Sequence, residues 1–303
     1  MPIESVVSPA QEHRSSDEAR SELESVSASA HITTVIEPQP GWKLLDLREM
    51  WRYRELLGFL VWRDVKVRYK QTVLGAMWAI LQPVATMVVF SLFFGRLAQM
   101  PAGDVPYPLF VFAGLLPWIF FSNAVSGAGG SVVGNQNLVT KVYFPRLFIP
   151  MGTIGAGLVD LVIAFGVLIV LMLGYRVMPG PQMLLVPLLT VALLAAALGV
   201  GVLLSALTVA YRDFRHVVPF MVQLWMFATP CVYMRTESFL SPRWNAILPL
   251  NPAFGIIQNF RAATLGEPLD WYSLGMSSAV ALGFLLLGCL YFRRVERSFA
   301  DVI

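Results

Sequence analysis

The sequence predicts an all-α, polytopic membrane protein with six spanning helices, and two observations carry this prediction. Of the 303 residues, 56% are hydrophobic and only 14% are charged, whereas a soluble domain has roughly 45–50% apolar and about 25% charged residues. The apolar residues also gather into runs long enough to cross a hydrocarbon core about 30 Å thick as helices. This pattern excludes a soluble enzyme, a nucleic-acid-binding domain and an outer-membrane barrel built from short alternating strands.

The N-terminal part of the chain differs from the rest. Residues 1–40 contain two basic and seven acidic residues and no aromatic side chain, so we expect a disordered, acidic cytoplasmic tail. Residues 41–72 are expected to form an interfacial helix followed by a basic entrance segment. In 44–62, apolar side chains recur roughly along one helical side, but the segment carries too many charges to span a bilayer.

Residues 73–303 are predicted to form the six-helix transmembrane domain. The predicted spans are residues 73–95, 107–127, 147–174, 183–209, 217–234 and 271–292. Between the last two, residues 235–270 contain several prolines among short apolar pieces. Proline ends helices, and unpaired backbone groups cannot face lipid. We therefore expect short re-entrant helices between the fifth and sixth spans.

The basic residues beside the spans predict the orientation of the chain. With the N-terminus inside, 15 lysines and arginines flank the spans on the cytoplasmic side and five lie outside. Short basic loops are retained in the cytoplasm, so both termini are predicted to be cytoplasmic. No long apolar stretch occurs before residue 73, so the first span is expected to direct insertion without a cleaved signal.

The polar residues of the predicted spans do not form a recognisable catalytic or metal-binding set. The spans contain no paired carboxylates, no histidine cluster and no nucleophile with its base, so no catalytic or metal site is expected. Asp160 is the acidic residue deep within a span. It is either a pathway residue that carries a proton or a structural carboxyl that hydrogen-bonds to a neighbouring helix. The chain also lacks the G-x-x-x-x-G-K-[ST] phosphate loop, so an ATP-driven mechanism would need a separate ATPase subunit.

Four segments together resemble a known family. They are RDVKVRYKQTVLGAMWAILQP, NQNLVTKVYFPR, AYRDFRH and LPLNP. Over about residues 42–303 the chain is similar to the membrane subunits of ABC-2 polysaccharide exporters, the permeases for O-antigen, capsular polysaccharide and teichoic acid, which have the type V exporter fold. The resemblance implies a homodimer in the bacterial inner membrane with two copies of a nucleotide-binding subunit. ATP and Mg²⁺ would bind to that partner, and this chain would hold no cofactor and bind no nucleic acid.

The resemblance also implies roles for particular residues. Contacts that couple the chain to the ATPase would come from the second and fourth cytoplasmic loops: Asn135, Lys141, Tyr143, Phe144, Arg146, Arg212 and Arg215. The entrance for an anionic lipid-linked substrate would be the basic stretch with Arg63, Lys66, Arg68 and Lys70. Channel and gate residues would be Trp78, Phe93, Trp118, Phe121, Trp225, Trp244, Asn251 and Pro252. Each set also has a simpler interpretation. The basic residues only orient the chain in the membrane, and the aromatic residues lie at the membrane–water interfaces.

The sequence thus predicts a non-enzymatic permease that exports lipid-linked polysaccharide with a partner ATPase. Three alternatives stay open at this point. An exporter of the same fold could carry a small drug or a lipid, although the basic entrance argues against it. A secondary carrier could use Asp160 as its proton site, and an intramembrane enzyme is disfavoured by the missing acid–base pair.

Overall fold

The computed structural model describes residues 47–70, 77–99, 105–142, 144–229, 231, 247–296 and 299. These residues fold into helices, and no strand occurs among them. The chain divides into two units, residues 1–40 and 41–303. The predicted acidic tail therefore lies outside the described residues, and everything below concerns the second unit.

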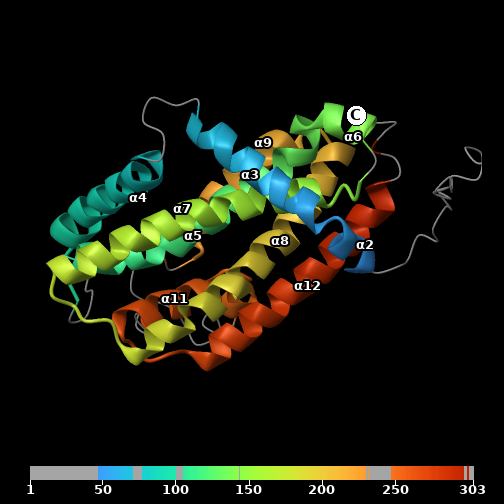
Figure 1. The fold of residues 1–303 in the computed structure, drawn as a ribbon. Coiled ribbons are helices and arrows are strands. Elements are labelled where there is room, and N and C mark those ends of the chain that lie inside the picture. Colours follow the sequence, from blue (N-terminus) through green and yellow to red (C-terminus); the bar gives the residue numbers. More distant parts are fainter. Residues whose placement is uncertain are drawn as a thin grey trace, which may run out of the picture. The chain divides into compact units, whose positions relative to one another are not determined.

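Figure 1 shows the helices in the order in which they follow one another along the chain. They are α2 (Leu47–Arg52), α3 (Arg54–Lys70), α4 (Met77–Phe90), the π-helix η1 (Ser91–Leu97), α5 (Tyr107–Gly134), α6 (Gln136–Lys141), α7 (Phe148–Gly174), the 3₁₀-helix η2 (Pro181–Leu185), α8 (Val186–Ala210), α9 (Phe214–Phe227), the 3₁₀-helix η3 (Leu248–Leu250), α11 (Phe254–Leu265) and α12 (Trp271–Glu296).

Five helical segments of the described chain are long and apolar enough to cross a membrane. They are Met77–Leu97, Tyr107–Gly134, Phe148–Gly174, Pro181–Ala210 and Trp271–Glu296. They match the predicted first, second, third, fourth and sixth spans, and the all-helical, polytopic membrane fold is confirmed. Span length and hydropathy were sufficient to find them, because only a helix of about 20 apolar residues satisfies its backbone across a bilayer.

The predicted fifth span, 217–234, differs in the structure. Its helix α9 has 14 residues and ends at Phe227, a length of about 21 Å at 1.5 Å per residue. Ala228 and Thr229 then form a turn, and Cys231 packs completely buried in the core. A helix of this length does not cross the hydrocarbon core by itself. The count of six spans therefore stays a prediction.

Helix α5 lies at the centre of the unit. It contacts α4, α7, α8, α9 and α11, and 78% of its most apolar stretch is buried, against 11% for the Met77–Leu97 segment. Side chains on every side of α5 are buried, as expected for a helix surrounded by protein. Helix α4, in contrast, leaves most of its apolar surface uncovered.

Helices α8 and α12 approach each other at two glycines. A Cβ atom on Gly199 would lie 2.5 Å from the backbone nitrogen of Leu285, and one on Gly288 would lie 2.6 Å from the carbonyl oxygen of Gly199. Small residues allow such backbone contact between membrane helices. The glycines here serve packing within one subunit.

The segment predicted to be re-entrant contains η3 and α11, and α11 is buried along nearly its whole length. It contacts α5, α8, η2 and α12. Its middle is joined to the residue before α12, because the Asn259 side chain exchanges hydrogen bonds of 2.9 and 3.0 Å with the backbone of Asp270. A short helix that is almost completely buried and lies next to the start of α12 is compatible with the predicted re-entrant arrangement. That α11 enters the membrane without crossing it stays a prediction.

Candidate functional site

The basic entrance segment lies on α3, which packs along the first half of α7 (Figure 1). Leu60 of α3 is buried against Gly152, and Val61 lies over Gly155. The two helices run in the same direction, since residues further along α3 meet residues further along α7. The segment predicted as interfacial is thus tied to a membrane-spanning helix along its second half.

Asp160 lies where α3 passes over α7. Arg68 forms an ion pair with one of its carboxylate oxygens, and the Tyr69 hydroxyl donates a hydrogen bond to the other. Both oxygens of the carboxylate are therefore engaged by consecutive residues of one helix. Burial and this hydrogen bond raise the pKa of Tyr69 to about 12, so the phenol stays protonated and remains a donor at neutral pH. We name Arg68, Tyr69 and Asp160 the clamp.

The clamp favours the structural reading of Asp160. A carboxylate at the centre of a membrane helix carries an insertion penalty of about 2.5–3.5 kcal/mol, and a paired cation reduces it. A carboxyl group that carries protons must instead exchange its proton with water or with other groups along a pathway. Asp160 is held instead by the Arg68 guanidinium and the Tyr69 hydroxyl, which belong to a neighbouring helix of the same subunit.

Arg63 links the entrance segment to the predicted coupling loop. Its guanidinium donates to Asp64 at 2.8 and 3.0 Å and to the side-chain oxygen of Asn135 at 3.1 Å. Asp64 in turn accepts a hydrogen bond from the Thr153 hydroxyl on α7 at 3.3 Å. Asn135 also donates to the Ser131 carbonyl oxygen at the end of α5 at 2.8 Å. This polar link joins α3, α5 and α7, and no pattern in the sequence predicted it.

Lys66 and Lys70 differ from the two arginines. Both lysines are exposed, one helical turn apart, on the side of α3 that faces away from α7. The four cations that the sequence grouped as one basic entrance therefore divide into two sets. Arg63 and Arg68 bind within the subunit, and the two lysines remain open to a ligand.

The short helix α6 presents the accessible part of the predicted coupling loop. Its inner residue Val139 is buried, while Lys141 is exposed and Val142, directly after the helix, is 51% exposed. Its other exposed residues are Gln136, Asn137 and Thr140. Tyr143 lies outside the described residues. In the fourth loop, Arg212 and Arg215 are exposed and stay available for the secondary contact that was expected of them.

Phe144 and Arg146 are placed differently from expectation. The Phe144 side chain is 6% exposed and belongs to a buried cluster with Phe148, Phe292 and Phe299. Arg146 donates to the carbonyl oxygen of Glu296 at the end of α12. A side chain buried in its own subunit cannot anchor a docked partner, and truncation of Phe144 would open a cavity instead. Phe144 therefore offers no surface to a partner, and the accessible side chains of this loop are those of α6 and Val142.

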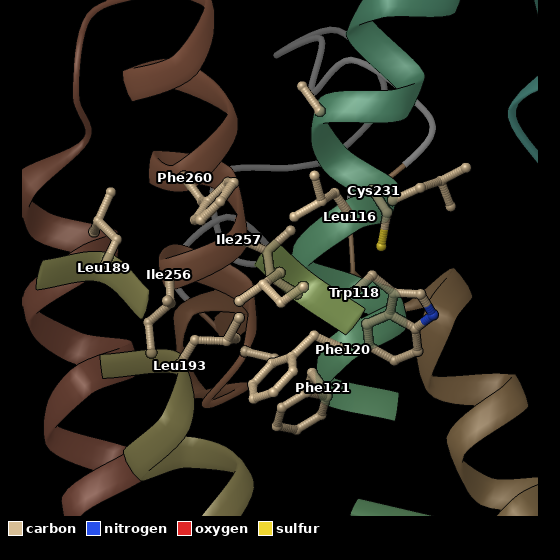
Figure 2. Packing of buried hydrophobic residues seen from close by; sticks show 14 of the residues in the cluster. Leu116, Trp118, Phe120, Phe121, Leu189, Leu193, Cys231, Ile256, Ile257 and Phe260 are labelled. Atoms are coloured by element: carbon tan, nitrogen blue, oxygen red, sulfur yellow. The ribbon is translucent and has the colours of Figure 1, made fainter. Parts of the chain in front are cut away.

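Three of the predicted channel aromatics form one cluster inside the subunit. The Phe121 ring lies 5.8 Å from the Trp118 ring and 5.2 Å, edge to face, from the Trp225 ring on α9. Trp118 and Phe121 are almost completely buried, and Figure 2 shows them in the buried cluster that also contains Ile257 of α11. In this arrangement their rings pack the α5–α9 contact.

The other predicted channel and gate residues separate into exposed and structural ones. Trp78 and Phe93 are 52% and 60% exposed on the outer side of the Met77–Leu97 segment. Asn251 donates to the Thr229 hydroxyl at 3.0 Å and accepts from the Ala253 backbone at 3.0 Å, so it links the end of α9 to the start of α11. Pro252 is buried beside it, and Trp244 lies outside the described residues.

The described residues thus define a polytopic helical membrane protein whose basic N-terminal helix is bound to its third predicted span and to the start of α6. Residues 55–265 match the family described as ABC-2 type transporter. The O-antigen export system permease protein RfbA of Myxococcus xanthus is 31% identical over 259 residues, which cover 85% of this chain and 98% of that relative. The chain belongs to the ABC-2 type transporter family.

Two further relatives are more distant. The O-antigen export system permease protein RfbA of Klebsiella pneumoniae is 22% identical over 82% of this chain and 95% of the relative. The polysialic acid transport protein KpsM of Escherichia coli is 26% identical over 78% of this chain and 92% of the relative. Membership of the family makes the chain a membrane transport subunit and not an enzyme, with ATP hydrolysis on a separate subunit.

Proposed function

We propose that this chain is the membrane-spanning permease of an ABC exporter that carries lipid-linked polysaccharide, O-antigen-like in type, from the cytoplasm across the bacterial inner membrane. The observation that carries the proposal is the alignment with an O-antigen export permease over almost the whole of that relative. The open lysines of α3 support it, since a lipid-linked glycan bears an anionic phosphate group. The aromatic residues of the membrane domain also suit passage of sugar rings.

The proposed assembly contains two copies of this chain and two copies of the ATPase, with ATP and Mg²⁺ bound by the ATPase alone. Both termini lie in the cytoplasm. The largely uncovered surface of α4 and the exposed apolar residues Phe220, Leu224 and Phe227 of α9 offer area for contact with a second copy. Trp78 and Phe93 would then line a channel between the copies.

In the proposed mechanism, closure of the ATPase dimer pushes on α6, and the polar link through Asn135 and Arg63 passes the movement to α3. Because α3 is held to α7 by the clamp, the two helices move as one body. This opens the path beside the exposed lysines, where the substrate enters. The chain makes and breaks no covalent bonds in this process.

Replacing Lys141 by Glu and Val142 by Asp tests the coupling surface. Both side chains are exposed, so the permease should fold as before. Loss of an exposed anchor and reversal of its charge should weaken ATPase binding by on the order of tenfold or more. Co-purification of the ATPase and the amount of polysaccharide at the cell surface measure the effect.

The matched control is Arg176→Glu, an exposed cation in the connection between α7 and η2, which should change neither quantity. Unchanged co-purification together with unchanged export in the Lys141/Val142 variant would refute the role of α6. ATP-dependent efflux of a hydrophobic dye, with no dependence of surface polysaccharide on the chain, would instead assign a small-molecule cargo.

A further inference from the structure

The loop that carries α6 is bound to a different helix on each side of α6. Before α6, the Asn135 side chain accepts a hydrogen bond of 3.1 Å from Arg63 of α3. After α6, Arg146 is bound to Glu296 of α12. The first contact belongs to the polar link described above. The second contact joins α6 to the helix whose start lies beside the re-entrant segment η3–α11.

Two hydrogen bonds connect Arg146 to Glu296. The Arg146 guanidinium donates to the carbonyl oxygen of Glu296, and the Arg146 amide donates to Oε1 of the Glu296 side chain at 3.2 Å. A hydrogen bond from a charged donor is roughly twice as strong as one between neutral groups. Both the backbone and the side chain of one residue of α12 are therefore bound to the loop after α6.

Apolar packing holds the same two segments together. Phe144, in the loop after α6, is buried in one cluster with Phe148 of α7 and Phe292 of α12. The Phe292 ring also lies edge to face on the Phe299 ring, with 5.2 Å between the ring centres. Buried side chains are close-packed and transmit strain. A displacement of the loop after α6 therefore displaces this part of α12 with it.

The other half of α12 holds the re-entrant segment through one hydroxyl group. The Ser277 hydroxyl accepts a hydrogen bond of 2.9 Å from the Gly255 amide at the start of α11. It shares its proton between the carbonyl oxygens of Pro249 and Asn251, each 2.9 Å away. Ser277 thus binds both η3 and α11. About 28 Å of helix separate Ser277 from Glu296, at 1.5 Å per residue.

Helix α12 is stiff between these two contacts. It contains no proline between Trp271 and Glu296, and proline is a common cause of sharp helix kinks. It also lies against α8, with backbone contact at Gly199 and Gly288. Figure 1 shows α12 running beside α8 from the α11 end of the unit towards α6. A rigid element that is bound at both ends carries a displacement from one end to the other.

We propose that Arg146 and Glu296 are positioning residues that pass the movement of α6 through α12 to the re-entrant segment. This inference rests on the proposed function and deepens it by assigning a separate task to each side of α6. Asn135, before α6, moves α3 and the entrance. Arg146, after α6, moves η3 and α11 at the opposite end of the path. One movement of the ATPase then acts on both ends of the path together.

Hydrogen exchange of the full complex of permease and ATPase in nanodiscs, without cargo, tests the proposal. With a catalytically inactive ATPase, ATP should change the exchange rates of α11 amides by about fivefold or more. In Arg146→Ala the rates with and without ATP should agree within about twofold, while the response of α3 is retained. Glu296→Ala should act in the same way, because it removes the acceptor of the Arg146 amide.

Conservative and neighbouring variants separate this role from stability. Arg146→Lys keeps a charged donor and should restore most of the response, and Glu296→Gln keeps an oxygen acceptor. Arg294→Ala removes an exposed cation of α12 two residues before Glu296 and should change nothing. With active ATPase, Arg146→Ala should lower the polysaccharide transported per ATP hydrolysed about fivefold. This ratio does not depend on how much of the complex is folded.

Three results would overturn the proposal. The first is an unaltered complex in which α11 does not respond to ATP, and the second is a full response of α11 in both alanine variants. The third is faster exchange throughout Arg146→Ala with an unchanged amount of polysaccharide per ATP, which would assign Arg146 to stability alone. The proposed function fails in a different way. A complex whose α11 responds to ATP, but which transports no lipid-linked glycan, would refute that function and leave this inference intact.

Discussion

Replacing Gly255 by Ala should prevent the normal packing of α11 on α12. A Cβ atom at this position would lie 2.0 Å from the carbonyl oxygen of Ser273 and 2.3 Å from its carbonyl carbon. These are backbone atoms inside a helix, so no side-chain rotation relieves the clash. The Gly255 amide also donates to the Ser277 hydroxyl at 2.9 Å, and this bond would be lost. We expect a destabilisation of about 3 kcal/mol or more.

The yield of monodisperse protein and its thermal unfolding in detergent measure this effect. Gly275→Ala is the control, because a Cβ atom on Gly275 in α12 would meet nothing within 4 Å. That change should be neutral or stabilising by about 0.5–1 kcal/mol, since alanine favours a helix over glycine. Equal stability of the two variants would contradict the close contact between α11 and α12.

The second large effect is expected at the clamp. Asp160→Ala leaves the Arg68 guanidinium and the Tyr69 hydroxyl without their acceptor, and Arg68→Ala leaves a carboxylate without its cation. Each change should loosen α3 from α7 and reduce export, and the double variant should be no worse than the single ones. The side chains of Arg68 and Asp160 are 40% and 26% exposed, so we expect a coupling energy of about 1–2 kcal/mol.

A double-mutant cycle, read by chemical unfolding in detergent, gives that coupling energy. Lys66→Ala lies on the opposite side of the same helix and should not change the stability. Asp160→Asn retains an oxygen that accepts from Tyr69 and should be milder than Asp160→Ala. Additive single effects would contradict the ion pair. Full stability of Asp160→Asn with complete loss of export would make Asp160 a pathway residue.

The spans of this protein could be predicted from its sequence because a bilayer imposes a minimum length on any apolar helix. Five runs of adequate length appear as helices close to the predicted bounds. The run at 217–234 shows the limit of that reasoning. Its helix ends at Phe227, and Cys231 then packs so close to α5 that a Cβ atom on Gly114 would lie 2.2 Å from the Cys231 carbonyl oxygen. Hydropathy alone does not predict that an apolar segment stops being helical in order to pack against another helix.

The sequence predicted the region of the candidate site. It did not predict which side chains of that region bind within the subunit and which are exposed. The basic character of α3 is visible in the sequence, but the partner of Arg68 is 92 positions away and that of Arg63 is 72 positions away. Phe144 has the flanking cations of an exposed anchor, yet it is buried by Phe292 and Phe299 near the other end of the chain. The spacing of Lys66 and Lys70 was present in the sequence, and only the structure shows that both side chains are exposed.

Transport by purified components in sealed vesicles tests the central claim most directly, namely that this chain moves its substrate only when a separate ATPase drives it. The permease alone should neither translocate a lipid-linked glycan nor hydrolyse ATP. Addition of the ATPase with ATP and Mg²⁺ should start transport, and collapse of the proton gradient should not stop it. Translocation or nucleotide hydrolysis by the permease alone, or transport that ends with the proton gradient and needs no ATPase, would contradict the account.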